Sequence, residues 1–401
     1  MNKAQYRSAP AGLVDAQPAT TTGLILSGGG ARAAYQVGVL AAIADLLPES
    51  ADNPFPVIVG TSAGAINAVG LACGALDFQQ AIRTLRSVWQ SFSSDLVYRT
   101  DWLGVMRQAG RFAGQHLLGL GRGADPVALL DNAPLRELLL KELDFSGINL
   151  AVAKRKLHAV AVTAFAYQSG QAVTFYQGRG TIDPWQRHRR HGLATRLNIE
   201  HLMASSAIPL LFAPVRVGRE YFGDGAVRQA APISPALHLG ADKVLVIGVR
   251  NQSQEGPSIP MTSRPPSLAQ IGGHLLNSTF IDNLEADLEL LGRLNMLGSM
   301  LPETERKKHL GLSPVDVLVI SPSKKIDDIA ARHRHQLPAS LRLFLRGPGA
   351  TRASGGGVLS YLLFERGYCN ELIELGYQDA MSQKDELLTF LGYSPSTTDT
   401  D

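Results

Sequence analysis

The sequence predicts an α/β fold in which a mostly parallel central sheet carries helices on both faces. Four continuous apolar runs are typical of strands buried on both sides, at residues 23–27, 55–60, 242–249 and 315–322. The first two runs each lead through a glycine-rich turn into a helical segment, and repeated strand–helix units favour a parallel sheet. The composition, 45% hydrophobic and 18% charged with 40 glycines, is that of a globular domain of this class.

The remaining elements follow in a regular order. Helices are expected after the first two strands, at about 33–47 and 63–73. Two alternating segments, 156–165 and 172–177, are separated by a turn and predict a pair of strands. A later helix should stop before Pro209, because proline cannot continue it.

Charge and cysteine content narrow the class of protein. The net charge of +3 and the pI near 8.8 give no case for nucleic-acid binding, although a mildly basic chain approaches an anionic lipid surface easily. Two cysteines, Cys73 and Cys369, are too few for a disulfide framework or a metal cluster, so a reducing compartment is expected. No secretory signal or membrane-spanning run is found. We expect a cytoplasmic protein, and peripheral contact with the inner face of the membrane stays open.

A serine at the end of the second strand is a candidate nucleophile. Ser62 lies in Gly60-Thr61-Ser62-Ala63-Gly64, which matches Gly-x-Ser-x-Gly. A serine on a sharp strand-to-helix turn has its hydroxyl pushed out at the sheet edge, and the glycines let neighbouring elements pass close by. The following helix points its N-terminus at this position, which favours developing negative charge.

A second glycine-rich turn, Gly28-Gly29-Gly30, follows the first strand and has two interpretations. A dinucleotide-binding turn would need an acidic residue at the end of the second strand, where this chain has Ser62. The alternative is a nest of backbone N–H groups that holds an oxyanion. The oxyanion interpretation is favoured because the neighbouring turn carries the serine.

Two kinds of base are open for Ser62. An α/β-hydrolase triad places a histidine after the acid, and none of the histidines that follow Asp224 lies in an obvious strand-end loop. The other base is a carboxylate that acts directly. Asp224 lies between Gly223 and Gly225, which would let its short side chain approach another backbone closely, although an Asp-Gly hairpin turn has the same pattern.

Taken together, the motifs resemble the patatin-like phospholipase family over about residues 22–250. The matching segments are 28–40, 60–64, 204–215 and 224–226. The resemblance implies a three-layer α/β/α fold, a Ser–Asp dyad, and hydrolysis of lipid acyl esters without a metal or other cofactor. The implied site consists of the nucleophile Ser62 and the base Asp224, an oxyanion hole from the Gly28, Gly29 and Gly30 turn with Arg32 nearby, the elbow residues Gly60, Thr61, Ala63 and Gly64, and the base turn Gly225 and Ala226.

One departure from the family pattern lies in the glycine turn. The family commonly has glycine after the basic residue, where this chain has Ala33; the change matters only if that backbone needs a positive φ. An acyltransferase with the same acyl-enzyme, or a non-catalytic lipid-binding protein of this fold, would share all these motifs.

Composition shifts divide the chain into four expected parts. These are a flexible tail over 1–22, a catalytic domain over 23–250, a linker and long helix over 251–314, and a last strand with C-terminal helices packing on the core over 315–401. The long helix, about 268–298, has apolar residues spaced by three and four. Such a stripe packs on a core, covers a site as a lid or meets a membrane.

Overall fold

The computed structural model describes residues 20–101, 128–180, 182–229, 231–251, 283–300, 314–346 and 356–393, with isolated positions between these ranges. The strands are β1 Thr22–Leu26, β2 Val57–Thr61, β3 Ala159–Ala166, β4 Gln171–Gly178, β5 Trp185–Arg187, β6 Arg190–Ala194, β7 Val215–Val217, β8 Glu220–Asp224, β9 Lys243–Ile247 and β10 Asp316–Ile320. They form one ten-stranded sheet in the order β10-β9-β1-β2-β3-β4-β6-β5, with β8 beside β3 and β7 beside β8.

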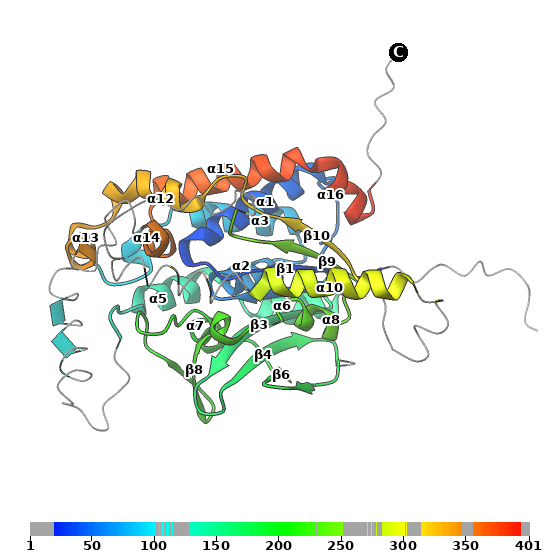
Figure 1. The fold of residues 1–401 in the computed structure, drawn as a ribbon, viewed down its shortest axis with the longest axis horizontal. Coiled ribbons are helices and arrows are strands. Elements are labelled where there is room, and N and C mark those ends of the chain that lie inside the picture. The colour runs from blue at the N-terminus through cyan, green and yellow to red at the C-terminus, as the bar shows by residue number, and fades with distance from the viewer. Residues whose placement is uncertain are drawn as a thin grey trace, which may run out of the picture.

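Helices cover both faces of this sheet (Figure 1). They are α1 Ala34–Leu46, α2 Ala63–Cys73, α3 Phe78–Gln90, α5 Ala133–Glu142, α6 Ser146–Ala153, α7 Ile199–Ser205, α8 Ser234–His238, α10 Asn283–Ser299, α12 Ile326–His333, α13 Ala339–Arg346, α14 Gly356–Leu362, α15 Arg366–Ser382 and α16 Lys384–Leu391. Short 3-10 turns occur at Gly30–Ala33, Ser94–Leu96, Gly225–Arg228 and Arg334–Gln336. The predicted fold class, a mixed α/β fold with a mostly parallel central sheet, is confirmed.

Five neighbouring strands, β10, β9, β1, β2 and β3, are parallel, and Leu24 of β1 lies opposite Ile58 of β2 and Leu245 of β9. Side chains alternate between the two faces, as the period of a strand requires. In β1, Leu24 and Leu26 enter the core under α1 and α2, whereas Ile25 enters the second core under α8 and α10. This double burial explains why the sequence shows continuous apolar runs.

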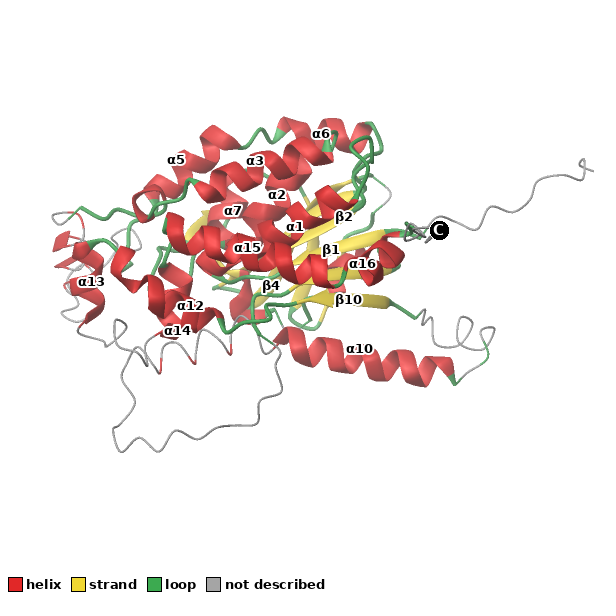
Figure 2. Cartoon of the chain, turned by 90° about the horizontal axis from the view of Figure 1, so that it is seen from above, coloured by secondary structure: helices red, strands yellow, loops and turns green. Residues whose placement is uncertain are grey.

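Helix α1 is buried on nearly all sides because the C-terminal helix α15 covers it. Figure 2 shows α1 and α15 together above the strands. The two helices cross at glycines: a methyl group on Gly38 would collide with the Ile373 carbonyl oxygen, and one on Gly376 with the Tyr35 carbonyl oxygen. Tyr35 also donates a hydrogen bond to Asp379 at 3.0 Å. The last part of the chain is therefore packed directly onto the helix that follows the glycine turn.

The long predicted helix is described only in its second half, as α10, which runs along the sheet beside β10 (Figures 1 and 2). Leu284, Leu288 and Leu291 pack in the second core, while Leu290 and Leu297 are exposed. Part of the predicted stripe thus packs on the core. Its residues before 283, like the predicted tail up to residue 19, lie largely outside the described residues.

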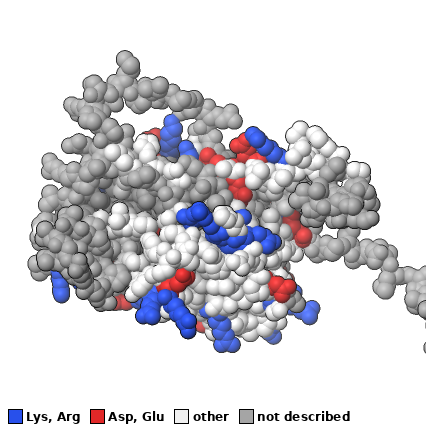
Figure 3. Space-filling model, turned by 60° about the horizontal axis from the view of Figure 1, so that its bottom comes forward, with Lys and Arg blue, Asp and Glu red and all other residues white. Residues whose placement is uncertain are grey.

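Surface charge is uneven on the side of β4, β6 and β8. Figure 3 views this side and shows Lys and Arg side chains in a band across the middle of the face. Arg187, at the end of β5, and Arg189, in the connection to β6, are exposed. Among the described residues, no helix is long and apolar enough to cross a membrane.

Candidate active site

Ser62 lies on the sharp turn between β2 and α2. Its backbone has φ 57° and ψ −132°, in a region that a residue with a side chain rarely adopts. Such a conformation costs about 1–3 kcal/mol and persists only where the surroundings impose it. Here Gly60 and Gly64 permit it: a methyl on Gly60 would lie 2.6 Å from the Ala65 Cα, and one on Gly64 would lie 2.5 Å from the Ser27 carbonyl oxygen.

Asp224 reaches the same edge of the sheet from a strand that runs the other way. Strand β8 is antiparallel to β3 and pairs Asp224 with Ala164. The Asp224 amide donates to the Ala207 carbonyl oxygen at 2.8 Å, and its Oδ1 accepts from the Ala226 amide at 3.0 Å. Gly225 lies against the Thr163 carbonyl oxygen, where a methyl group would collide. The base turn is therefore held on both sides of the carboxylate.

Ser62 and Asp224 are both buried, with exposed fractions of 2% and 0%. Burial raises the pKa of Asp224 to about 7, and hydrogen bonding from the Ser62 hydroxyl and the Ala226 amide opposes this rise. Asp224 Oδ2 has no partner with regular hydrogen-bond geometry among the described residues. The Ser62 hydroxyl thus lies beside the Asp224 carboxylate, but the two do not form a well-aligned hydrogen bond. Hydrogen bonds between catalytic groups are often poorly aligned before substrate binds.

The glycine turn lies next to the elbow because β1 and β2 are adjacent parallel strands. Gly28, Gly29 and Gly30 are buried. Among the backbone hydrogen bonds of the described chain, neither Gly28 nor Gly29 is a donor. Buried amides without an acceptor are rare in native proteins, so the turn has donors to offer a bound anion. This arrangement fits an oxyanion hole.

Comparison with known proteins agrees with the geometry. The family model described as patatin-like phospholipase matches residues 24–237, more than half of the chain. This chain belongs to the patatin-like phospholipase family. A curated protein of Pseudomonas aeruginosa (strain BWHPSA011 / Pa011), named cGAMP-activated phospholipase, is 29% identical over 216 residues, which are 54% of this chain and 55% of that protein. The chain thus matches about half the length of this relative.

A solved structure is also similar to this patatin-like chain. The crystal structure of VipD from Legionella pneumophila aligns with 92% of this chain and 67% of its own, at 12% identity and a TM-score of 0.35. Similarity at this level carries no functional conclusion.

The departure from the family pattern at Ala33 is explained by the backbone. Ala33 has φ −65° and ψ −10°, the ordinary right-handed helical region. Glycine's freedom is therefore not needed at this position, whereas Gly30, with φ 56°, does use it.

Two sets of hydrogen bonds near Ser62 were not predicted from the sequence. Ser205 Oγ accepts from the Ser62 amide at 2.9 Å and donates to the Thr163 carbonyl oxygen at 2.7 Å. Asn67, on α2, donates to Gln36 Oε1 at 3.0 Å, and Gln36 in turn donates to the Ser27 carbonyl oxygen at 2.8 Å. Ser205 lies in the segment 204–215 that carries the family resemblance, which was the available signal. Gln36 likewise lies in the matching segment 28–40, whereas Asn67 gave no signal beyond polarity in an apolar helix.

Histidines lie elsewhere in the described part of this patatin-like fold. His201 accepts from the Asn198 amide through Nδ1 at 3.1 Å and so caps α7. His238 stacks on Trp185, with ring centroids 4.8 Å apart. His333 pairs with Glu371 at 2.5 Å. No hydrogen bond between described residues joins a histidine to Ser62 or Asp224.

A large cavity lies away from the dyad. Its volume is about 940 Å³, and it is an open pocket lined by α10 and the strands β9 and β10, with Lys243, Val315 and Val317 in its wall. Lys243 begins its parallel strand, so this cavity opens near the amino ends of the strands. Sites in open α/β sheets form at the carboxyl ends, where Ser62 lies. We therefore place the candidate site at the dyad.

Proposed function

We propose that this protein is a serine acyl hydrolase that cleaves acyl esters of lipids, phospholipids or lysophospholipids, with Ser62 as nucleophile and Asp224 as base. One observation carries the proposal: a buried carboxylate and a serine with a strained backbone meet at one sheet edge, beside a glycine turn with buried amides. Membership of the patatin-like phospholipase family points to the same lipid class.

In the proposed reaction, the Ser62 oxygen attacks the ester carbonyl while Asp224 takes the hydroxyl proton. The tetrahedral oxyanion receives hydrogen bonds from amides of the Gly28–Gly30 turn. Collapse of this intermediate expels the alcohol, which takes the proton from Asp224, and leaves the acyl group on Ser62. Water, deprotonated by Asp224, then releases the fatty acid and restores the serine. A base works best when its pKa is close to the working pH, and a pKa of about 7 meets this condition.

Ser62→Ala and Asp224→Asn test the dyad with a short-chain nitrophenyl ester. Each should lower kcat by at least about a thousandfold, because the nucleophile and its base act as a unit and the loss of either one removes most of the catalysis. The circular dichroism spectrum should stay that of the wild type. Ser91→Ala, which removes an exposed hydroxyl at the end of α3, is the control and should keep wild-type activity. Full activity in Asp224→Asn would remove the dyad.

The lipid class is tested by a panel of phospholipids and lysophospholipids, with Ser62→Ala as the blank. Fatty acid and the matching lyso-lipid or glycerol-phosphate product are expected. Because the curated relative is named a cGAMP-activated phospholipase, the panel is run with and without cGAMP. Transfer of the acyl group to added glycerol in place of fatty acid release would assign an acyltransferase instead.

A further inference from the structure

A buried cluster beside the glycine turn joins it to the C-terminal part of the chain. Its centre is Arg32, which follows the turn and is 2% exposed. Arg32 Nη2 donates to Asp327 Oδ1 and to Ser360 Oγ, each at 2.7 Å, and Nε donates to Ser360 Oγ at 2.9 Å. The guanidinium carbon lies 4.1 Å from the centroid of the Tyr361 ring. We call Arg32, Asp327, Ser360 and Tyr361 the Arg32 cluster.

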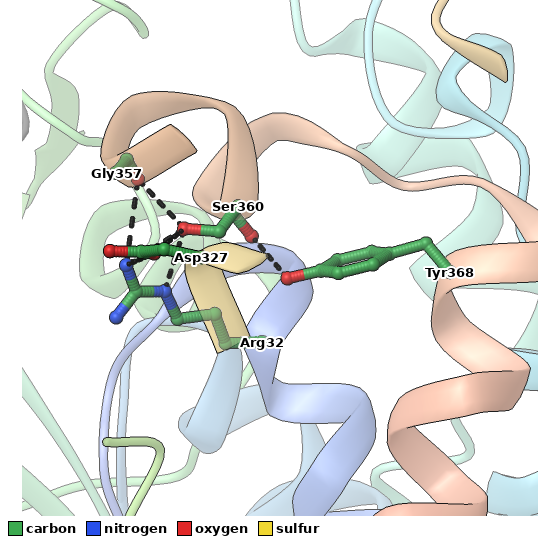
Figure 4. A network of polar contacts seen from close by, with 5 residues as sticks. All are labelled: Arg32, Asp327, Gly357, Ser360 and Tyr368. Atoms are coloured by element: carbon green, nitrogen blue, oxygen red, sulfur yellow. Dashed lines mark hydrogen bonds and ion pairs between the residues drawn. The ribbon is translucent and has the colours of Figure 1, made fainter. Parts of the chain in front are cut away.

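The cluster is held in place by its own neighbours (Figure 4). The Ser360 hydroxyl lies 2.9 Å from Asp327 Oδ1 and 2.7 Å from the Gly357 carbonyl oxygen, and it can donate to either. Tyr368 donates to the Ser360 carbonyl oxygen at 3.2 Å. Ser360 is thus fixed at both its side chain and its backbone, and it presents its oxygen to the guanidinium.

Arg32 needs this cluster because it stays charged at every accessible pH. A buried charge that loses its partner is strongly unfavourable. The partner carboxylate, Asp327, comes from α12, and its side chain is 40% exposed, whereas that of Arg32 is 3% exposed. The family model ends at residue 237, so Asp327 and Ser360 lie outside the segment that it matches.

The same C-terminal segment also touches the turn through its backbone. Gly30 adopts φ 56°, and a methyl group there would collide with the Tyr361 carbonyl oxygen. On its other side, a methyl on Gly29 would lie 2.8 Å from Val249 Cγ2. Within the turn, the Arg32 amide donates to the Gly29 carbonyl oxygen at 3.2 Å, and the chain continues as the 3-10 turn Gly30–Ala33. Contacts from outside the turn therefore set its position.

We propose that Asp327 and Ser360 are positioning residues for the reaction proposed above. Through Arg32 they hold the Gly28–Gly30 turn where its amides meet the oxyanion formed on Ser62, and they do not touch the substrate. The inference rests on the proposed function and adds to it a part of the chain that the family domain does not contain.

Steady-state kinetics on the nitrophenyl ester test this role. Asp327→Asn should lower kcat by about tenfold to a hundredfold, since a misplacement of about 1 Å at a catalytic group has an effect of this size. KM should stay within about twofold, because the ester-binding surface is untouched. Ser360→Ala should act in the same direction, and the double variant should lose little beyond the worse single one, since both act through Arg32.

The matched control is Asp328→Asn. Asp328 neighbours Asp327 on α12 but is exposed, so this variant should behave as the wild type. Amide hydrogen exchange supplies a readout besides activity: residues 28–32 should exchange faster in Asp327→Asn and Ser360→Ala than in Asp328→Asn. If Asp327→Asn does not fold, Ser360→Ala, which removes one hydroxyl, decides alone.

Three results would overturn the inference: kcat of folded Ser360→Ala equal to that of Asp328→Asn, a rise in KM in place of a fall in kcat, or unchanged exchange of residues 28–32. Failure of the proposed function looks different, because the wild type itself would then release no more product than Ser62→Ala. The exchange measurement still tests the Arg32 cluster in that case.

Discussion

The two glycine-rich turns of the site are supported in different ways. The elbow at Gly60–Gly64 packs against the end of β1 at the Leu26 and Ser27 carbonyl oxygens. Its partners from farther along the chain, Ser205 and Gln229, both lie within the segment that the family model matches. The turn at Gly28–Gly30 meets Val249 on one side and Tyr361 on the other, and Arg32 ties it to residues more than 290 positions away. Similar strand–glycine–helix sequences therefore depend on different parts of the chain.

The difference follows from what each turn presents to a substrate. The elbow presents a side chain, and a strained backbone between two tightly packed elements is enough to aim it. The glycine turn presents backbone amides, which have no side chain to anchor them. Asn67 and Gln36 link the two turns through α2 and α1, but this link does not reach the Arg32 cluster. The second turn thus needs support from outside the family domain.

Apart from the variants of Ser62 and Asp224 themselves, the largest effects should come from adding a methyl group to each turn. Gly64→Ala places a Cβ against the Leu26 and Ser27 carbonyl oxygens, and Gly30→Ala places one against the Tyr361 carbonyl oxygen at a positive φ. Both should lower kcat by at least about a hundredfold. Amide exchange should separate them, because α14 should exchange faster in Gly30→Ala and stay unchanged in Gly64→Ala. Equal exchange of α14 in both variants would contradict the comparison.

The pH dependence of kcat/KM tests the role of Asp224 as the base for Ser62. Asp224 must be ionised to accept the Ser62 proton, and burial raises its pKa to about 7. The rate kcat/KM should therefore fall about tenfold per pH unit below pH 7 and level off above it. A stopped assay from pH 5 to 9 measures this. A midpoint near pH 4 would mean that the carboxylate is solvated in the working enzyme.

A smaller effect on stability has opposite signs at Asp224, beside the elbow, and at Asp327, which supports the glycine turn. Folding raises the pKa of Asp224 from about 4 to about 7. Between these pH values Asp224 is ionised in the unfolded chain but still protonated in the folded protein, so the free energy of unfolding falls as the pH rises. Asp224→Asn cannot ionise, so it should melt a few degrees above the wild type at pH 8 and level with it at pH 4. Asp327→Asn should melt below the wild type at pH 8, since Arg32 loses its carboxylate. If the melting temperatures of both variants shifted in the same direction from that of the wild type at pH 8, this contrast would be refuted.

Local pattern predicted much of the fold and part of the site. The apolar runs around β1, β2 and β9 located strands because both faces are buried, and α2 begins and ends at the expected residues, Ala63 and Cys73. Ser62 was recognisable because a serine on a strained strand-to-helix turn needs glycines on both sides, and Gly60 and Gly64 are visible in the sequence. Asp224 required the family resemblance, since an Asp-Gly turn is common. That it is a buried carboxylate beside Ser62 follows only from the antiparallel pairing of β8 with β3.

The Arg32 cluster could not be predicted. Asp327 lies among charged residues at the start of a helix and looks like an ordinary residue of a first helical turn. Ser360 lies in an apolar segment and looks like an ordinary core residue. Their role depends on how α12 and α14 pack against the turn, which no local pattern encodes. For α10 likewise, the sequence predicted an apolar stripe. It did not predict which leucines pack on the core and which are exposed.

The Arg32 cluster also has a consequence for how the protein is made. Arg32 leaves the ribosome 295 residues before Asp327, and at about 5–20 residues per second the interval is about 15 to 60 s. During this time β1, the glycine turn and the elbow are all synthesised, but Asp327 and Ser360 are not yet available to the guanidinium. The nascent domain should therefore acquire its turn geometry, and with it any lipid-cleaving activity, only after α12 and α14 have left the ribosome.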